Sequence, residues 1–104
     1  MEVFIEEGEV LFVKLPKEID HYRVRGLSAA IDAAIMEKEP MKVVFDFSNV
    51  QFMDSSGIGL LIGRYRNMKY VGGTVYTYGA NAHMAKIIAL SGVGKYIGKY
   101  EETK

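Results

Sequence analysis

The sequence contains no cysteine and no tryptophan, and only two of its 104 residues are proline. Without cysteine the chain can form no disulfide and has no thiolate nucleophile, and a zinc or iron–sulfur site would lack its commonest soft ligands. We therefore expect no metal and no other cofactor. A cysteine-free chain of this kind suits the reducing environment of the cytoplasm.

Long hydrophobic runs are also missing. No apolar stretch approaches the roughly 20 residues that a membrane-spanning helix needs. The first ten residues, MEVFIEEGEV, carry acidic side chains where a secretory signal carries basic ones. We expect a cytoplasmic protein that is complete within this chain and does not bind a membrane.

Neither sign of charge is in excess, because 13 basic residues balance 13 acidic ones. No basic stripe exists that could follow the phosphates of a nucleic acid, so we expect no nucleic-acid partner. The length suits one domain with one core, and the hydrophobic content of 49% is ordinary for a globular protein. We predict a single domain over residues 1–104.

The first part of the chain predicts a hairpin followed by a helix. In VFIEEGEVLFVKL, alternating apolar residues flank Gly8, which suits a tight turn between two strands. From Asp20 onward, apolar residues recur at intervals of three and four, which places them on one face of a helix: Val24, Leu27, Ile31 and Ile35. Asp20 is the expected N-cap, and Pro40 is the expected stop.

The rest of the chain alternates strands and helices. Residues 43–47 are short and almost continuously apolar, as in a central strand buried on both faces. A second helix ends before Gly72, with a predicted inward stripe of Ile58, Leu61, Ile62, Tyr65 and Met68. A strand over 74–78, a helix from Ala82 that Gly92 closes, and a weak strand or extended tail over 96–100 follow. The order ββαβαβα(β) predicts an α/β domain with a mixed sheet and helices packed against it.

The motif MDSSGIG places Asp54, Ser55 and Ser56 at the start of the second helix. Two interpretations are open. Asp and Ser are the favoured residues for capping the free N–H groups of a first helical turn. Alternatively, Ser56 accepts a phosphate, because the positive end of a helix dipole and its free N–H groups would hold the added charge without disturbing the fold.

A helical wheel places Ser56 opposite the inward stripe, on a solvent-facing side shared with Gly59, Leu60 and Gly63. Each interior glycine costs about 1 kcal/mol relative to alanine, so helix stability alone would not select them. One explanation is a flat, slightly apolar docking surface for another protein. The other is that one glycine is tolerated and the other packs against a neighbouring loop.

The glycines and serines do not match known catalytic or nucleotide motifs. Gly57, Gly59 and Gly63 lie too far after a strand for a dinucleotide fingerprint, and no phosphate loop is present. A nucleophilic serine would need a histidine base, but only His21 and His83 exist, and the esterase pattern GxSxG is absent. We predict no catalytic residue and no enzyme activity.

The stretch FDFSNVQFMDSSGIGLLIGRYRNMKYVGG resembles the signature of STAS-domain anti-sigma-factor antagonists, as do KEIDHYRVRGL and IIALSGVGKYI at either side. Within that family the sequence is most similar to the sporulation antagonists of the anti-sigma-F factor, and the general-stress antagonists are also similar. The resemblance extends over nearly the whole chain. It implies a STAS-like α/β fold and a non-enzymatic regulator of transcription.

The resemblance implies two partners. One is an anti-sigma factor that is also a serine kinase: the unphosphorylated antagonist binds it and thereby releases the sigma factor. Phosphorylation of the second serine of the motif, Ser56 here, ends this binding, and a serine phosphatase acting on phospho-Ser56 reverses it. The expected partner-binding residues are Asp20, His21, Asp54, Ser55, Ser56, Gly57, Gly59, Leu60 and Gly63. The alternative is a small-ligand-binding or sensory STAS domain without a kinase partner, with a pocket near Asp20 and Ser56.

Overall fold

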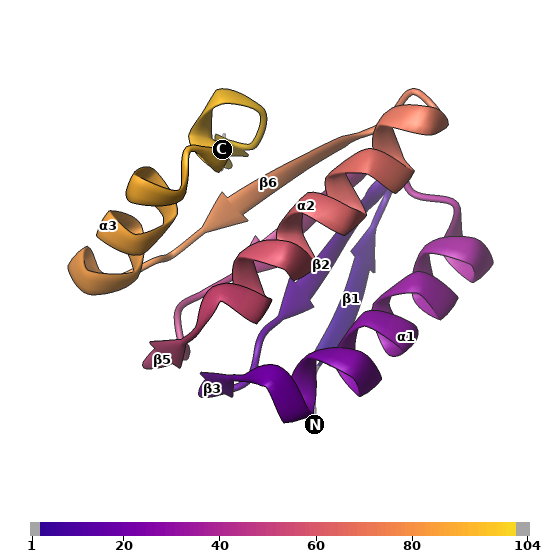
Figure 1. Cartoon of the computed structure of the whole chain (residues 1–104). Coiled ribbons are helices and arrows are strands. Elements are labelled where there is room, and N and C mark those ends of the chain that lie inside the picture. Colours follow the sequence, from indigo (N-terminus) through magenta and orange to yellow (C-terminus); the bar gives the residue numbers. More distant parts are fainter. Residues whose placement is uncertain (1–2, 102–104) are drawn as a thin grey trace.

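In the computed structural model, residues 3–101 are described, and they form a sheet with helices on one side (Figure 1). The strands are β1 (Val3–Glu7), β2 (Val10–Lys14), β3 (Glu18–Ile19), β4 (Lys42–Asp46), β5 (Phe52–Met53), β6 (Thr74–Tyr78) and β7 (Gly98–Lys99). The helices are α1 (His21–Lys38), α2 (Ser55–Tyr70), α3 (Ala82–Ser91) and the short 3₁₀ helix η1 (Val93–Lys95). The predicted element order is confirmed, with β3, β5 and η1 as additions.

The main sheet has the strand order β1-β2-β4-β6-β7 and is mixed, as predicted. Only the β1–β2 hairpin is antiparallel, and its turn contains Gly8 at a φ of 63°. The other neighbours are parallel, with Leu11 opposite Val43 and Val43 opposite Val75. Strand β4 lies at the centre, and its residues Val43, Val44 and Phe45 are fully buried, which confirms the prediction of a strand covered on both faces.

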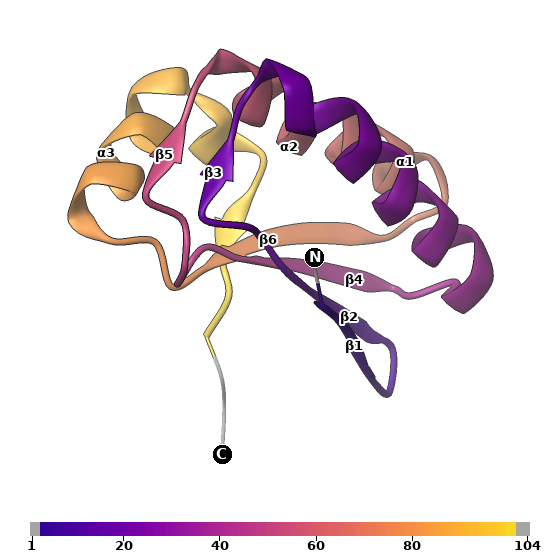
Figure 2. The same ribbon diagram turned by 90° about the horizontal axis from the view of Figure 1, so that it is seen from below.

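All three long helices cover the same face of the sheet (Figure 2). Helix α1 begins after its N-cap Asp20, buries Leu27 and Ile31, and ends at Glu39, just before Pro40. Helix α3 is closed by Gly92, which adopts a left-handed φ of 84°. These helix limits and caps agree with the sequence predictions. The last predicted strand is reduced to the two residues of β7.

The helix-free face of the sheet is covered by aromatic side chains. Phe12, Val44 and Tyr76 are paired in register across three adjacent strands and so share this face. The ring of Tyr100 lies edge-on to both aromatic rings, with centroids 5.6 Å from Phe12 and 5.7 Å from Tyr76. This cluster accounts for the complete burial of Val44 on a face that no helix protects.

The buried side of α2 differs from the prediction. Leu61 and Met68 are fully buried as expected, but Ile58, Ile62 and Tyr65 are only partly buried. The fully covered residues are Gly57, Leu60, Leu61 and Met68. Helix α2 is covered by the sheet on one side and by α1 on another (Figure 1). Its buried surface is therefore wider than the predicted stripe and is shifted toward α1.

Candidate functional site

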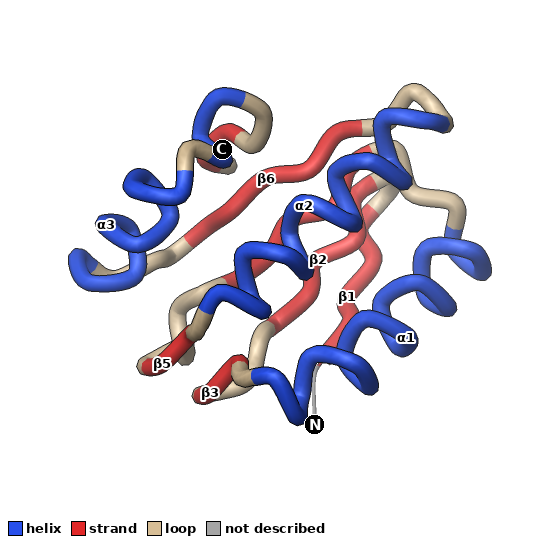
Figure 3. The backbone as a smooth tube through the Cα atoms, in the orientation of Figure 1, coloured by secondary structure: helices blue, strands red, loops and turns tan. Residues whose placement is uncertain are grey.

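A short parallel pairing between β3 and β5 brings the beginnings of α1 and α2 together. Glu18 lies opposite Phe52 and Ile19 opposite Met53, in a two-stranded sheet separate from the main one (Figure 3). Each of these strands is followed directly by an aspartate that caps the next helix: Asp20 before α1 and Asp54 before α2. The two positive helix ends therefore lie next to each other.

Asp54 connects the two helix ends through one carboxylate. Its Oδ1 accepts the backbone N–H of Ser56 at 2.8 Å, which caps α2. Its Oδ2 accepts the backbone N–H of His21, the first residue of α1, at 3.2 Å. The backbone N–H of Asp54 in turn donates to Ile19 O at 3.1 Å. The predicted proximity of the turn at Asp20 and the serine motif is thus realised by specific hydrogen bonds.

Asp20 is engaged within its own helix turn. Its Oδ1 accepts the backbone N–H of Arg23 at 2.9 Å, and its Oδ2 accepts Arg23 Nη1 at 2.7 Å. The same guanidinium lies 3.5 Å from Glu18 Oε1. Arg23 therefore offsets part of the negative charge of Asp20 and Glu18, and the sequence analysis did not single it out.

Ser55 and Ser56 are the first two residues of α2. Ser55 is exposed and Ser56 is half-buried, so neither serine is sealed in the core. Within residues 3–101, no group is hydrogen-bonded to the Ser56 hydroxyl, whereas its backbone N–H is bound by Asp54. The capping role belongs to Asp54 alone, and the Ser56 hydroxyl remains available to another molecule.

The glycines of α2 fall into two kinds. At Gly57, which is buried, an added Cβ would overlap the Met53 side chain, so this glycine is required by packing. At Gly59 and Gly63 an added Cβ would have no neighbour within 4 Å, which leaves open space above the helix. The explanation that one of these two packs against a loop is therefore wrong.

The prediction that Leu60 is exposed is wrong. Its side chain is only 3% exposed and belongs to the core cluster, because α1 covers the side of α2 that the helical wheel assigned to solvent. Arg64 follows one turn later and forms an ion pair to α1, with Nε 3.1 Å from Asp32 Oδ1. The surface that remains beside Ser56 consists of glycine backbone and not of a leucine side chain.

Two exposed aromatic residues next to the aspartates were missed by the sequence analysis. Tyr22, the second residue of α1, is 90% exposed, and Phe52 in β5 is 51% exposed. The ring of His21 lies edge-on to Tyr22, with centroids 6.3 Å apart. Exposed aromatic residues are enriched at protein interfaces, and this signal could have been read from the sequence, where Phe52 stands two residues before Asp54 and Tyr22 two residues after Asp20.

Almost the whole chain matches a known protein family. The model of the STAS domain family matches residues 3–104. The chain belongs to the STAS domain family. A relative from Lysinibacillus sphaericus, named anti-sigma F factor antagonist, is 33% identical over 89 residues, which cover 86% of this chain and 76% of the relative. A Paenibacillus polymyxa protein of the same name is also 33% identical, over 88% of this chain and 79% of its own.

Solved structures agree with the STAS fold. The anti-sigma factor antagonist SpoIIAA in its unphosphorylated form superposes with a TM-score of 0.83 at 28% identity, covering 98% of this chain and 90% of SpoIIAA. The phosphorylated form of the Bacillus cell fate determinant SpoIIAA gives a TM-score of 0.75 at 29% identity, covering 98% and 93%. The α/β fold and the family assignment made from the sequence are confirmed.

Among residues 8–101, whose side chains are described, no group of three or more histidine, aspartate or glutamate residues is arranged to hold a metal ion. None of the helices in this part of the chain is both long enough and apolar enough to span a bilayer.

Proposed function

We propose that this STAS domain, which we take to comprise the whole chain, is an anti-sigma-factor antagonist. In its unphosphorylated form it binds an anti-sigma factor that is also a serine kinase, and the sigma factor is released. The observation that carries the proposal is the free, half-buried hydroxyl of Ser56 at the N-terminus of α2, beside the Asp20 turn. The names of the relatives and of SpoIIAA support the same role.

Phosphorylation of Ser56 is the proposed off-switch, and a serine phosphatase reverses it. A phosphate adds a charge of about −1.5 to −2 at the end of α2, where backbone N–H groups and the helix dipole favour an anion. The fold is therefore retained. A partner that contacts the surface formed by Asp20, Ser56, Gly59 and Gly63 would meet new bulk and charge, and repulsion of a few kcal/mol weakens binding more than a hundredfold.

The predicted partner-binding residues have three different roles. The partner-binding surface consists of Asp20, His21, Ser55, Ser56, Gly59 and Gly63. Asp54 organises it, since its carboxylate holds both helix ends in place. Gly57 and Leu60 support it from below, because both are buried. The protein acts by binding and has no catalytic residue, and a cytoplasmic location follows from its proposed partners.

Kinase labelling tests the switch. We expect incubation with the cognate anti-sigma factor kinase and ATP to add one phosphate to the wild-type chain, located at Ser56 by peptide mass spectrometry. Ser55→Ala is the matched control and should still be labelled, whereas Ser56→Ala should not. Labelling that persists in Ser56→Ala, or a wild-type chain that takes no phosphate, contradicts the proposal.

Binding measurements test the consequence of the phosphate. Ser56→Asp should bind the anti-sigma factor at least about a hundredfold more weakly than wild type by calorimetry. Its circular dichroism spectrum and melting temperature should stay close to those of wild type. A variant that unfolds would show that Ser56 is structural, and a folded variant with unchanged affinity would show that this face is not the binding surface.

A further inference from the structure

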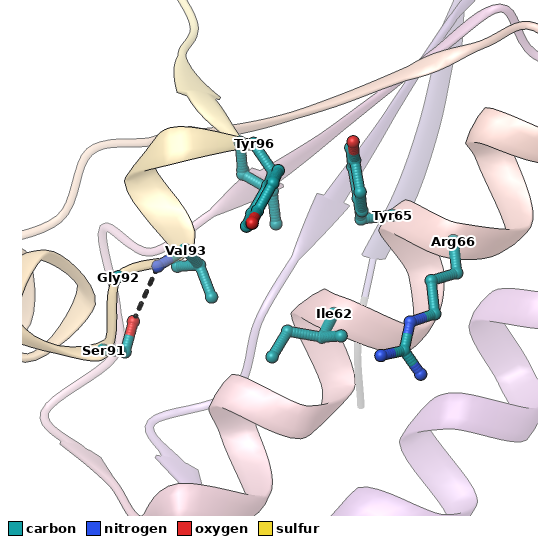
Figure 4. A pocket seen from close by; sticks show the side chains of 8 residues that line it. Ile62, Tyr65, Arg66, Ser91, Gly92, Val93 and Tyr96 are labelled. Atoms are coloured by element: carbon teal, nitrogen blue, oxygen red, sulfur yellow. Dashed lines mark hydrogen bonds between the residues drawn. The ribbon is translucent and has the colours of Figure 1, made fainter.

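A hollow of about 260 Å³ lies between the middle of α2 and the segment around η1 (Figure 4). Its lining comes from two parts of the chain that are far apart in sequence: Ile62, Tyr65 and Arg66 on one side, and Ser91, Gly92, Val93, Tyr96 and Ile97 on the other. Ile62 follows Ser56 by six residues, which places the hollow roughly 9 Å further along the helix axis. The hollow is therefore offset from the Ser56 hydroxyl, although Ile62 is adjacent in sequence to Gly63 of the proposed partner-binding surface.

The inside of this hollow is apolar and aromatic. Val93 and Ile97 form part of the core cluster, each only 3% exposed, and Ile62 packs against that cluster. The rings of Tyr65 and Tyr96 pack against each other at one side of the hollow, with centroids 5.6 Å apart and planes inclined at 40° (Figure 4). Tyr96 is 63% exposed, so its ring forms a wall that a bound molecule can contact.

Positive charge lies to one side of the hollow, where the side chain of Arg66 runs past Ile62 and away from Val93 and Tyr96 (Figure 4). No acidic residue lines the hollow. The guanidinium of Arg66 has no acidic partner within residues 3–101, whereas Arg23 and Arg64 are paired with carboxylates. Lys69 adds a second cation, with Nζ 5.9 Å from the centre of the Tyr65 ring. An unpaired arginine beside an apolar hollow is complementary to an anion that carries a hydrophobic body.

A second hollow, of about 440 Å³, lacks this combination. It lies beside the loop after β4 and is lined by Lys17, Ser48, Asn49, Val50, Gln51 and Asn81, which are mostly polar and exposed. In the order β1-β2-β4-β6-β7, each new strand is added on the same side of the one before it. The strand order never reverses, so the sheet has no topological switch point, which is where open α/β sheets bind ligands.

We propose that the hollow between α2 and η1 binds a small monocarboxylate with an alkyl or aryl body. The apolar part lies against Ile62, Val93 and the two tyrosine rings, and the carboxylate accepts hydrogen bonds from Arg66. The volume of about 260 Å³ is below the ~300–1,000 Å³ of pockets for drug-sized ligands, which limits the ligand to a small molecule. This inference does not depend on the proposed anti-sigma function.

Titration of the full chain with octanoate, followed by amide NMR, tests the site. We expect saturable shifts concentrated at Ile62, Gly92, Val93 and Tyr96. Octanamide has the same length without the charge, and it should bind about three- to fivefold more weakly, the scale of an exposed ion pair. Non-saturating shifts, or shifts spread over the whole surface, overturn the proposal.

Arginine variants test the role of the charge. Arg66→Gln should lower the octanoate affinity by the same factor and leave the octanamide affinity unchanged. Arg25→Gln is the matched control, because Arg25 is an exposed arginine of α1 with no partner in residues 3–101. Equal losses in both variants, or none in either, would show that Arg66 does not hold a carboxylate in this hollow. None of these measurements involves a kinase or an anti-sigma factor, so they fail or succeed independently of the switch at Ser56.

Discussion

The backbone N–H of His21 donates to Asp54 Oδ2 at 3.2 Å, although 33 residues separate them in the sequence. The other oxygen of the same carboxylate caps α2 at Ser56. One side chain therefore fixes the relative position of two helix N-termini, and the hydroxyl of Ser56 is presented beside the Asp20 turn as a result. The organisation of the proposed partner surface depends on this one aspartate.

Asp54→Ala should destabilise the domain by about 1–2 kcal/mol, because α2 loses its cap. Urea denaturation measures this loss, and Asp54→Asn should recover most of it because the amide oxygen still accepts the Ser56 N–H. In the alanine variant the amide hydrogens of Ser56 and His21 should also exchange faster.

Asn81→Ala serves as the control for the link between the helices. Asn81 caps α3 by accepting the Met84 N–H at 2.8 Å, so its loss should cost a similar free energy. It should leave exchange at His21 unchanged. If the Asp54 and Asn81 variants affect His21 equally, the carboxylate does not hold the two helix ends together.

Gly57→Ala and Gly59→Ala should change stability in opposite directions. An added Cβ at Gly57 overlaps the Met53 side chain and lies 3.4 Å from Ile19 Cγ2, and overpacking of this kind costs about 1–3 kcal/mol. Gly59 has open space and a helical backbone, so alanine should stabilise the domain by up to about 1 kcal/mol. Thermal unfolding distinguishes them, and a destabilised Gly59→Ala would contradict the open geometry.

The stabilising alanines should nevertheless weaken the partner complex. If the backbone of α2 at Gly59 and Gly63 is approached closely by an anti-sigma factor, the double variant Gly59→Ala, Gly63→Ala should bind it less tightly while melting at a higher temperature. Gly26→Ala is the matched control: it lies within α1, also has open space, and is outside the proposed surface. Undiminished binding by the double variant would remove these glycines from the interface.

Glu39→Gly should raise the melting temperature. Glu39 ends α1 in the left-handed region, at a φ of 49° and a ψ of 51°, and it is the only non-glycine residue of the described chain with a positive φ. Glycine adopts this conformation without the penalty of a side chain, so we expect a gain of about 1 kcal/mol, or about 4–8 °C. Lys38→Gly, one residue earlier and still helical, should instead destabilise the domain by about 0.5–1 kcal/mol.

Local chemistry in the sequence was enough to predict most elements. The strands around Gly8, the helix between Asp20 and Pro40, the central position of residues 43–47 and the end of α3 at Gly92 are confirmed. Each depends on interactions within a few residues: alternation in strands, three- and four-residue spacing in helices, a carboxylate on a free N–H, or a glycine at positive φ. A helical wheel uses only one helix, however, and it assigned Leu60 to solvent because it contains no information about α1.

The sequence by itself determined the order of the main strands and helices, the N-cap of α1, the glycine that closes α3, and the presence of a serine motif at the start of α2. The tertiary structure decided what surrounds that motif. The pairing of β3 with β5, the hydrogen bond from His21 to Asp54 and the burial of Leu60 all join segments that are distant in the chain. Short-range rules describe a residue and its near neighbours, whereas these contacts exist only after the sheet has placed α1 beside α2.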